Sequence, residues 1–167
     1  MTVTSVRKDP KALTMIVESE FETSPERIWR LWADPRQLER WWGPPTYPAT
    51  FTRHDLAKGS RVEYYMTGPE GDESHGYWDV VEVDPPRSLV FQDGFAGEDG
   101  SPATDLPLTT ARVTIEPVDS GRTRMSIESR FPSAEAMEQI LAMGMEEGLK
   151  QALGQIDAIL AEDARAL

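Results

Sequence analysis

Histidine is the side chain most often used for metal binding and for proton transfer near neutral pH, and it occurs only twice in this chain. His54 precedes Asp55 near the end of one expected strand, and His75 follows a run of acids at the start of another. Neither has a partner at the i, i+4 spacing that puts two ligands on one helix face. We therefore interpret both as surface or turn residues, and predict no metal site and no cofactor.

Acid–base catalysis would need a carboxyl or phenol group that faces a dry cavity. Tyr64 lies on the apolar face of an expected strand, and we interpret it as a half-buried tyrosine whose hydroxyl group finds a hydrogen-bond partner. Asp79 and Asp93 are interpreted as solvent-facing. The sequence contains no glycine-rich phosphate loop and no nucleophile elbow. No catalytic residue is predicted, and the sequence favours a protein that is not an enzyme without excluding one.

A binding site is better supported, because the last long apolar pattern carries two glycines. The spacing predicts a helix over Ser133–Glu162, with Ser133 as its N-cap and no proline inside it. Gly144 and Gly148 lie one turn apart in the apolar stripe, where each costs about 1 kcal/mol relative to alanine. They could allow close packing against a sheet, or they could leave room for a ligand; both explanations remain open.

Aromatic and methionine side chains would form the walls of such a space, since they suit flat or irregular apolar ligands. Met143 falls off the apolar stripe and could mark a protein contact or a dimer face. The predicted cavity-lining residues are Tyr64, Met66, Trp78, Phe91, Met125, Ile127, Leu141, Gly144, Met145 and Gly148.

The elements that would position these residues begin with an alternating strand over Leu13–Glu22. Ser24-Pro25-Glu26 then starts one short helix, since a capping hydroxyl precedes a proline at the first helical position. That helix ends at Asp34-Pro35, and a second short helix follows over Arg36–Trp42.

Six further strands follow, separated by turns rich in glycine and proline. The inward face of the strand from His75 to Asp84 is ambiguous, because valines occur on both faces. The irregular segment Ala96–Leu108 could act as a flap over an opening. The expected strands are Ala49–Asp55, Arg61–Thr67, His75–Asp84, Ser88–Phe95, Thr109–Pro117 and Thr123–Arg130.

The composition limits the class of protein. A chain of 167 residues with a net charge of −12 suits one domain, which we place at 13–162 between tails at 1–12 and 163–167. The negative charge argues against nucleic acid and anionic membranes as partners. The absence of cysteine excludes disulfides and thiolate chemistry. With no signal peptide and no long apolar run, we expect a cytoplasmic protein.

Together these elements predict an α+β fold. Short turns require antiparallel neighbours, and a sheet with one apolar face needs a cover. We therefore expect a curved antiparallel sheet of about seven strands around a long C-terminal helix, with two short helices between the first and second strands.

Three stretches carry a resemblance to a known family over about residues 13–161. They are Thr23-Ser24-Pro25-Glu26-Arg27-Ile28-Trp29 with Trp41-Trp42-Gly43-Pro44, then the run from Glu82 to Phe91, and the run from Met143 to Leu149. The sequence resembles the helix-grip superfamily (START-like, birch-pollen-allergen-like, SRPBCC), in its branch homologous to the activator of heat-shock protein 90 ATPase. The resemblance implies a curved sheet gripping the last helix with a cavity between them, and it transfers no reaction.

Three functions remain open. The first is binding of a small apolar or aromatic molecule under the C-terminal helix. The second is binding of a protein partner, in the manner of a co-chaperone or stress-response module, or of a second copy, through Met143 or the Trp41-Trp42 segment. The third is a cyclase, dehydratase or hydrolase acting on an aromatic or polyketide-like substrate, which needs at least two polar side chains inside the cavity.

Overall fold

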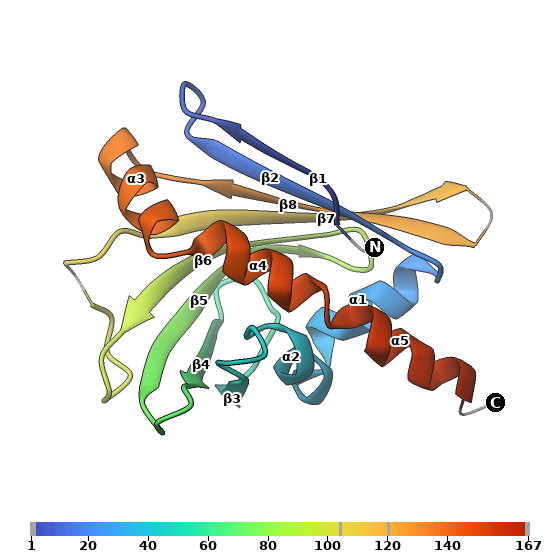
Figure 1. The fold of residues 1–167 in the computed structure, drawn as a ribbon, viewed down its shortest axis with the longest axis horizontal. Helices are drawn as coiled ribbons and strands as arrows, with labels where there is room; N and C mark the ends of the chain where they lie inside the picture. Colours follow the sequence, from blue (N-terminus) through green and yellow to red (C-terminus); the bar gives the residue numbers. More distant parts are fainter. Residues whose placement is uncertain (1–2, 104, 120, 166–167) are drawn as a thin grey trace.

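One antiparallel sheet forms the body of the molecule in the computed structural model, which describes residues 3–103, 105–119 and 121–165 (Figure 1). Within these residues the sheet contains eight strands: β1 Val3–Asp9, β2 Thr14–Phe21, β3 Ala49–Arg53, β4 Arg61–Thr67, β5 Glu73–Asp84, β6 Ser88–Ala96, β7 Thr109–Asp119 and β8 Arg122–Arg130. Their spatial order is β1-β2-β8-β7-β6-β5-β4-β3. The α+β antiparallel fold is thus confirmed, with one strand more than expected.

The additional strand is β1, which lies in the segment that we expected to be a tail. It pairs antiparallel with β2, from Val3 opposite Ser19 to Asp9 opposite Thr14. The Asp9 carboxylate accepts hydrogen bonds from the backbone N–H groups of Lys11 and Ala12, at 3.0 and 3.2 Å. Asp9-Pro10 therefore forms a hairpin turn rather than marking a loose arm.

The two short helices lie between β2 and β3, as predicted. Helix α1 covers Pro25–Ala33, and its N-cap Ser24 accepts a hydrogen bond from the backbone N–H of Arg27 at 3.2 Å. Helix α2 covers Pro35–Trp41, and Asp34 caps it through the N–H of Arg36 at 2.9 Å. Capping side chains followed by proline therefore start both helices.

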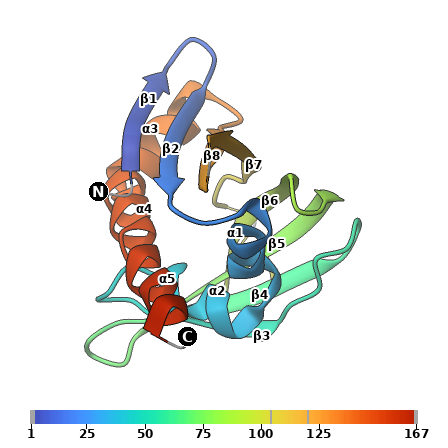
Figure 2. The same ribbon diagram turned by 90° about the vertical axis from the view of Figure 1, so that its right-hand side faces the viewer.

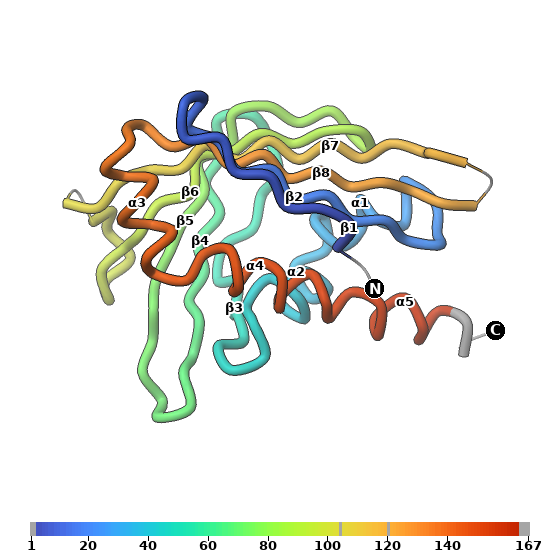
Figure 3. The backbone as a smooth tube through the Cα atoms, turned by 45° about the horizontal axis from the view of Figure 1, so that its top comes forward, coloured from blue at the N-terminus to red at the C-terminus, as the bar shows by residue number. Residues whose placement is uncertain are grey.

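The C-terminal cover consists of three helices rather than one continuous rod. They are α3 Ala134–Ala142, α4 Met145–Leu153 and α5 Ile156–Arg165, which extends into the expected C-terminal tail. Gly144 has φ +91°, a left-handed conformation that ends α3 and caps α4. In Figures 1 and 3, α4 and α5 follow one another along one line, whereas α3 lies at an angle to them.

The sheet curves around these helices, and Figure 2 shows α3, α4 and α5 across its open side. On β5 the side chains of Trp78 and Val80 are buried in the core, which settles the inward face of this strand. A bulge between Val80 and Glu82 shifts the register, so that Val81 is exposed. None of the helices in the described residues is long and apolar enough to span a membrane.

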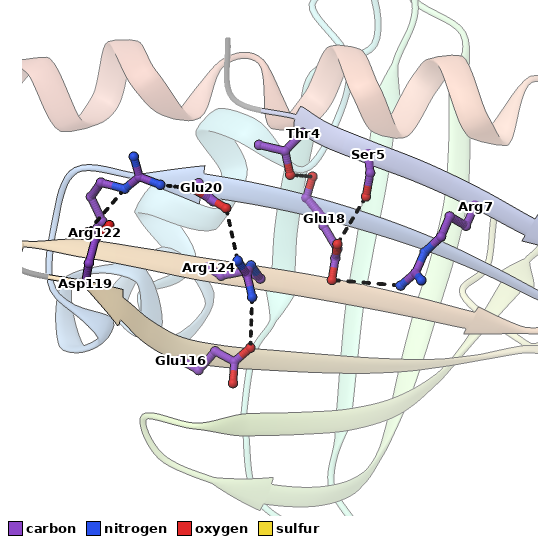
Figure 4. Close-up of polar contacts among 9 residues, drawn as sticks. All are labelled: Thr4, Ser5, Arg7, Glu18, Glu20, Glu116, Asp119, Arg122 and Arg124. Atoms are coloured by element: carbon purple, nitrogen blue, oxygen red, sulfur yellow. Dashed lines mark hydrogen bonds and ion pairs between the residues drawn. The ribbon is translucent and has the colours of Figure 1, made fainter.

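The opposite face of the sheet is charged, as the alternation of its strands predicts. Figure 4 shows charges of opposite sign alternating across the strands. Glu20 on β2 pairs with Arg122 and Arg124 on β8, and Arg124 lies 3.8 Å from Glu116 on β7. Such cross-strand pairs suit a solvated sheet face.

Candidate functional site

A cavity of about 350 Å³ lies between the inner face of the sheet and the helices α3 and α4. Its floor is formed by Tyr64 and Met66 of β4 and by Phe91 of β6. Ile140 of α3 and Leu149 of α4 form part of its roof. The volume falls in the range of about 300–1,000 Å³ that is usual for small-molecule sites.

The roof of the cavity carries no side chain at Gly144 and Gly148. A Cβ atom built on either glycine would have no heavy atom within 4 Å. The glycines therefore do not serve to let bulky side chains pack closely against the helix. Both glycines line the cavity, with Gly144 at its exposed side and Gly148 half-buried.

The floor holds a hydrogen-bonded pair of polar side chains. The Tyr64 hydroxyl group donates to Oδ1 of Asp93 at 3.0 Å. The two residues come from β4 and β6, so the tyrosine ring crosses over β5, where Gly76 is paired with Tyr64. A Cβ atom on Gly76 would lie 2.5 Å from the Tyr64 hydroxyl oxygen, so only glycine leaves the ring in this place.

The pair has unusual titration properties. Burial raises the pKa of Asp93 to about 7, an effect that the hydrogen bond from Tyr64 offsets in part. Burial, reinforced by the nearby Asp93 carboxylate, raises the pKa of Tyr64 well above its ordinary value. Near neutral pH the phenol of Tyr64 is therefore neutral, and the carboxyl group of Asp93 can change its charge.

Two tryptophans stand beside the pair. The rings of Trp42 and Trp78 each lie 6.2 Å from the ring of Tyr64, centroid to centroid. Both indole N–H groups are buried without a hydrogen-bond partner among the described residues, although they lie near enough to the Tyr64 oxygen to oppose the rise in the tyrosine pKa. The polar atoms of this floor are thus only partly satisfied.

Seven of the ten predicted cavity residues line the space. They are Tyr64, Met66, Phe91, Ile127, Gly144, Met145 and Gly148. Trp78 is instead stacked behind Phe91 with ring centroids 4.1 Å apart, and the sulfur of Met125 accepts a hydrogen bond from the indole of Trp32 at 3.2 Å. Leu141 packs against the core. Ligand contact by any of these residues stays a prediction.

Further residues line the cavity without having been predicted to do so. The chief one is Asp93, which we had interpreted as solvent-facing; its alternation with Phe91 on one strand face is a signal that could have found it. The polar group is Tyr47, Ser74, His75, Asp93, Thr109 and Ser129, and the other group is Trp42, Pro44, Gly94, Phe95, Ala111, Ile140, Met143 and Leu149.

The remaining candidates for chemistry lie elsewhere or are otherwise engaged. Asp79 is paired with Arg61, at 2.8 and 3.1 Å. His54 Nε2 lies 2.9 Å from the carbonyl oxygen of Trp32, and His75 Nε2 lies 3.0 Å from Glu73. Among the described residues no group of three or more histidine, aspartate or glutamate side chains could hold a metal ion.

Two expected surface features take a different form. Trp41 is fully buried and Trp42 lies in the cavity wall, so this segment offers no broad aromatic surface patch. Met143 is 56% exposed and lies at the rim of the cavity. Of the segment Ala96–Leu108, no described residue lines the cavity, so nothing places it as a flap.

A larger hollow of about 520 Å³ lies between β2 and α5. Its lining includes Glu20 and Arg122, which pair with each other. The charged pair of this hollow is thus internally neutralised, and among its described lining residues there is no aromatic side chain apart from Phe21. The cavity under α3 and α4 is therefore the better candidate site.

Comparison with known proteins supports the fold described above. The family described as "Activator of Hsp90 ATPase homolog 1-like protein" matches residues 22–161. No match was found among curated proteins.

Solved structures with the same fold come from several bacteria. A crystal structure of a Mycobacterium smegmatis protein is 49% identical, with a TM-score of 0.88, and the match covers 95% of this chain and 96% of that one. A solution structure of an Arthrobacter aurescens protein is 50% identical, with a TM-score of 0.92 and coverage of 96% and 93%. The AHSA1 protein of Silicibacter pomeroyi is 25% identical, with a TM-score of 0.71 and coverage of 90% and 99%.

Proposed function

The chain belongs to the family of Activator of Hsp90 ATPase homolog 1-like proteins, and we propose that it serves as a binding protein for a small apolar or aromatic molecule. The ligand occupies the cavity between the sheet and the helices α3 and α4. The proposal needs no covalent step.

The observation that carries this proposal is the open space under the two bare glycines. A Cβ atom on Gly144 or Gly148 would have no heavy atom within 4 Å, and the rings of Tyr64 and Phe91 line the same cavity. A glycine inside a helix lowers its stability by about 1 kcal/mol relative to alanine. Gly148 therefore maintains an open volume at the expense of the stability of α4.

The test is a thermal-shift screen with apolar and aromatic compounds, followed by calorimetric titration of those that raise the melting temperature. A ligand that binds only the folded state stabilises it. A melting temperature unchanged across a broad apolar library would contradict the proposal.

A variant that fills the cavity makes the test specific. Gly148→Leu adds a side chain on the cavity side of α4, and leucine is a better helix former than glycine. We expect this variant to fold and to lose ligand binding. Gln151→Leu is the matched control, because it adds the same side chain at an exposed position of the same helix that does not line the cavity.

Catalysis is a second candidate, and a specific observation favours it. Tyr64 and Asp93 converge within the cavity, so the requirement for two polar side chains is met. Compounds that bind should be recovered and analysed by mass spectrometry after long incubation. Conversion that is lost in both Tyr64→Phe and Asp93→Asn would support an enzyme, and recovery of unchanged compound would support binding alone.

A further inference from the structure

The cavity contains a carboxyl group but no cationic side chain to neutralise it. Among the described residues that line it, none is lysine or arginine, and the only basic one is His75. The imidazole of His75 is engaged with Glu73 at 3.0 Å. An ionised carboxylate in such a place is stable only if something supplies positive charge or several hydrogen-bond donors.

One oxygen of this carboxyl group is free to meet a ligand. Tyr64 donates to Oδ1 of Asp93, and no other described residue donates to the carboxyl group. Burial raises the pKa of Asp93 to about 7, and the hydrogen bond from Tyr64 offsets this rise only in part. A ligand that brings a donor or a positive charge would offset the rest.

The surrounding walls suit a cation as well. The rings of Trp42, Tyr64 and Phe91 line the same space as Asp93. Aromatic faces attract an ammonium group within about 6 Å of the ring centroid. Carboxylate and aromatic walls together thus form a site for an organic cation rather than for an anion.

We propose that the ligand carries a basic nitrogen, and that Asp93 binds this nitrogen as an ammonium group while the aromatic walls hold the apolar body. This inference rests on the proposed binding function and names the chemical class of the ligand. It assigns to Tyr64 the positioning of the carboxylate through its hydrogen bond.

The main competitor is a neutral ligand that accepts a hydrogen bond from protonated Asp93. The two cases differ in the sign of their pH dependence. An ammonium ligand binds the ionised carboxylate, so its affinity rises as the pH increases through about 7. A carbonyl ligand binds the protonated acid, so its affinity falls over the same range.

Other titrating groups that face the cavity are few. From β4 there is Tyr64, from β5 His75, and from the loop before β3 Tyr47; the lining residues of β7, β8, α3 and α4 do not titrate. Histidine side chains in general change charge near neutral pH. His75→Gln is therefore the variant that separates an imidazole effect from that of Asp93.

The experiment uses three probes of equal aromatic body: naphthylmethylamine, naphthylmethanol and acetonaphthone. Each is titrated calorimetrically into the full chain at pH about 6 and about 8, where the amine probe remains protonated and Asp93 changes charge. We expect the amine to bind about tenfold more tightly than the alcohol at the higher pH, and to lose most of that advantage at the lower pH. In Asp93→Asn the amine should bind no better than the alcohol at either pH.

Each other result has a definite meaning. If the alcohol binds as tightly as the amine, or acetonaphthone binds best at low pH, the basic-nitrogen inference is overturned while the binding function stands. If the pH dependence disappears in His75→Gln and survives in Asp93→Asn, Asp93 is not the anchor. If no probe binds and the apolar library also fails, the proposed function falls together with the inference.

Discussion

Tyr64 and Asp93 belong to strands that are not neighbours, yet they are joined by a hydrogen bond of 3.0 Å. The tyrosine reaches across the intervening strand β5 because that strand carries Gly76 at the crossing point. A part-buried polar contact in the cavity thus depends on Gly76, a residue without a side chain.

The ionisation of Asp93 should make the stability of the protein depend on pH. The pKa of Asp93 is raised from its ordinary value to about 7 in the folded chain. Between the two pKa values the folded state therefore binds more protons than the unfolded state. The free energy of unfolding should therefore fall as the pH rises from about 4 to about 7. Asp93→Asn should stabilise the protein by about 1–2 kcal/mol at pH about 8 and have little effect at pH about 4.

Urea denaturation at the two pH values measures this effect. Asp79→Asn is the matched control, since its carboxylate is paired with Arg61 on the outer side of the sheet. An equal change of stability at both pH values for Asp93→Asn would contradict the prediction.

Gly76→Ala should disturb the tyrosine directly. The new methyl group would lie 2.5 Å from the hydroxyl oxygen of Tyr64, so the ring must move. We expect a loss of about 1–3 kcal/mol in unfolding free energy, as for other overpacked cores. In the double variant with Tyr64→Ala most of that loss should disappear, and simple additivity of the two changes would refute the explanation.

The two glycines of the roof should respond in opposite directions to alanine. Gly148→Ala should stabilise the protein by about 0.5–1 kcal/mol, because the new methyl group has open space and improves the helix. Gly144→Ala should destabilise it by about 1–2 kcal/mol, because φ is +91° at this position. Chemical denaturation of both variants measures the two changes. Changes of the same sign would contradict the left-handed conformation at Gly144 or the helical conformation at Gly148.

Arg27 should contribute more to stability than the acid with which it is paired. Its side chain is 9% exposed and bonds to Asp163 of α5 and to Gln37 of α2, whereas Asp163 is 50% exposed. We expect Arg27→Ala to cost about 1–3 kcal/mol and Asp163→Asn less than about 1 kcal/mol. Equilibrium denaturation gives both values, and hydrogen exchange should show faster opening of α5 in Arg27→Ala.

The same pair also has a pH signature. The hydrogen bond from Arg27 lowers the pKa of Asp163. The contribution of this ion pair to the unfolding free energy is therefore fully present above the ordinary aspartate pKa, and it is lost as the pH falls through the lowered pKa. If Arg27→Ala and Asp163→Asn change the hydrogen-exchange rates of α5 equally, the guanidinium group of Arg27 contributes nothing beyond its pairing with Asp163.

Local signals in the sequence were sufficient for most of the fold. The caps at Ser24 and Asp34, each followed by proline, place α1 and α2, and strand alternation places the inner face of β4, β7 and β8. The strand β1 was missed because its sequence is polar and its stability comes from pairing with β2, a contact that periodicity does not report.

The candidate site was predictable only in part. The glycines could be recognised as unusual, but a helix-breaking Gly144 and a helical Gly148 look alike in an apolar stripe that continues past both. Asp93 was misplaced because a charged side chain usually faces water. Its alternation with Phe91 along β6 indicates the inward face, once Phe91 is assigned to the core.

The helices that cover the cavity bend between α3 and α4, and the bend is formed by the backbone rather than by side-chain packing. Because the left-handed conformation of Gly144 fixes the bend, the angle between α3 and α4 is set by the main chain at this position. Substitutions among the wall residues would therefore leave the angle between α3 and α4 in place, so that the shape of the cavity can change without a change of fold.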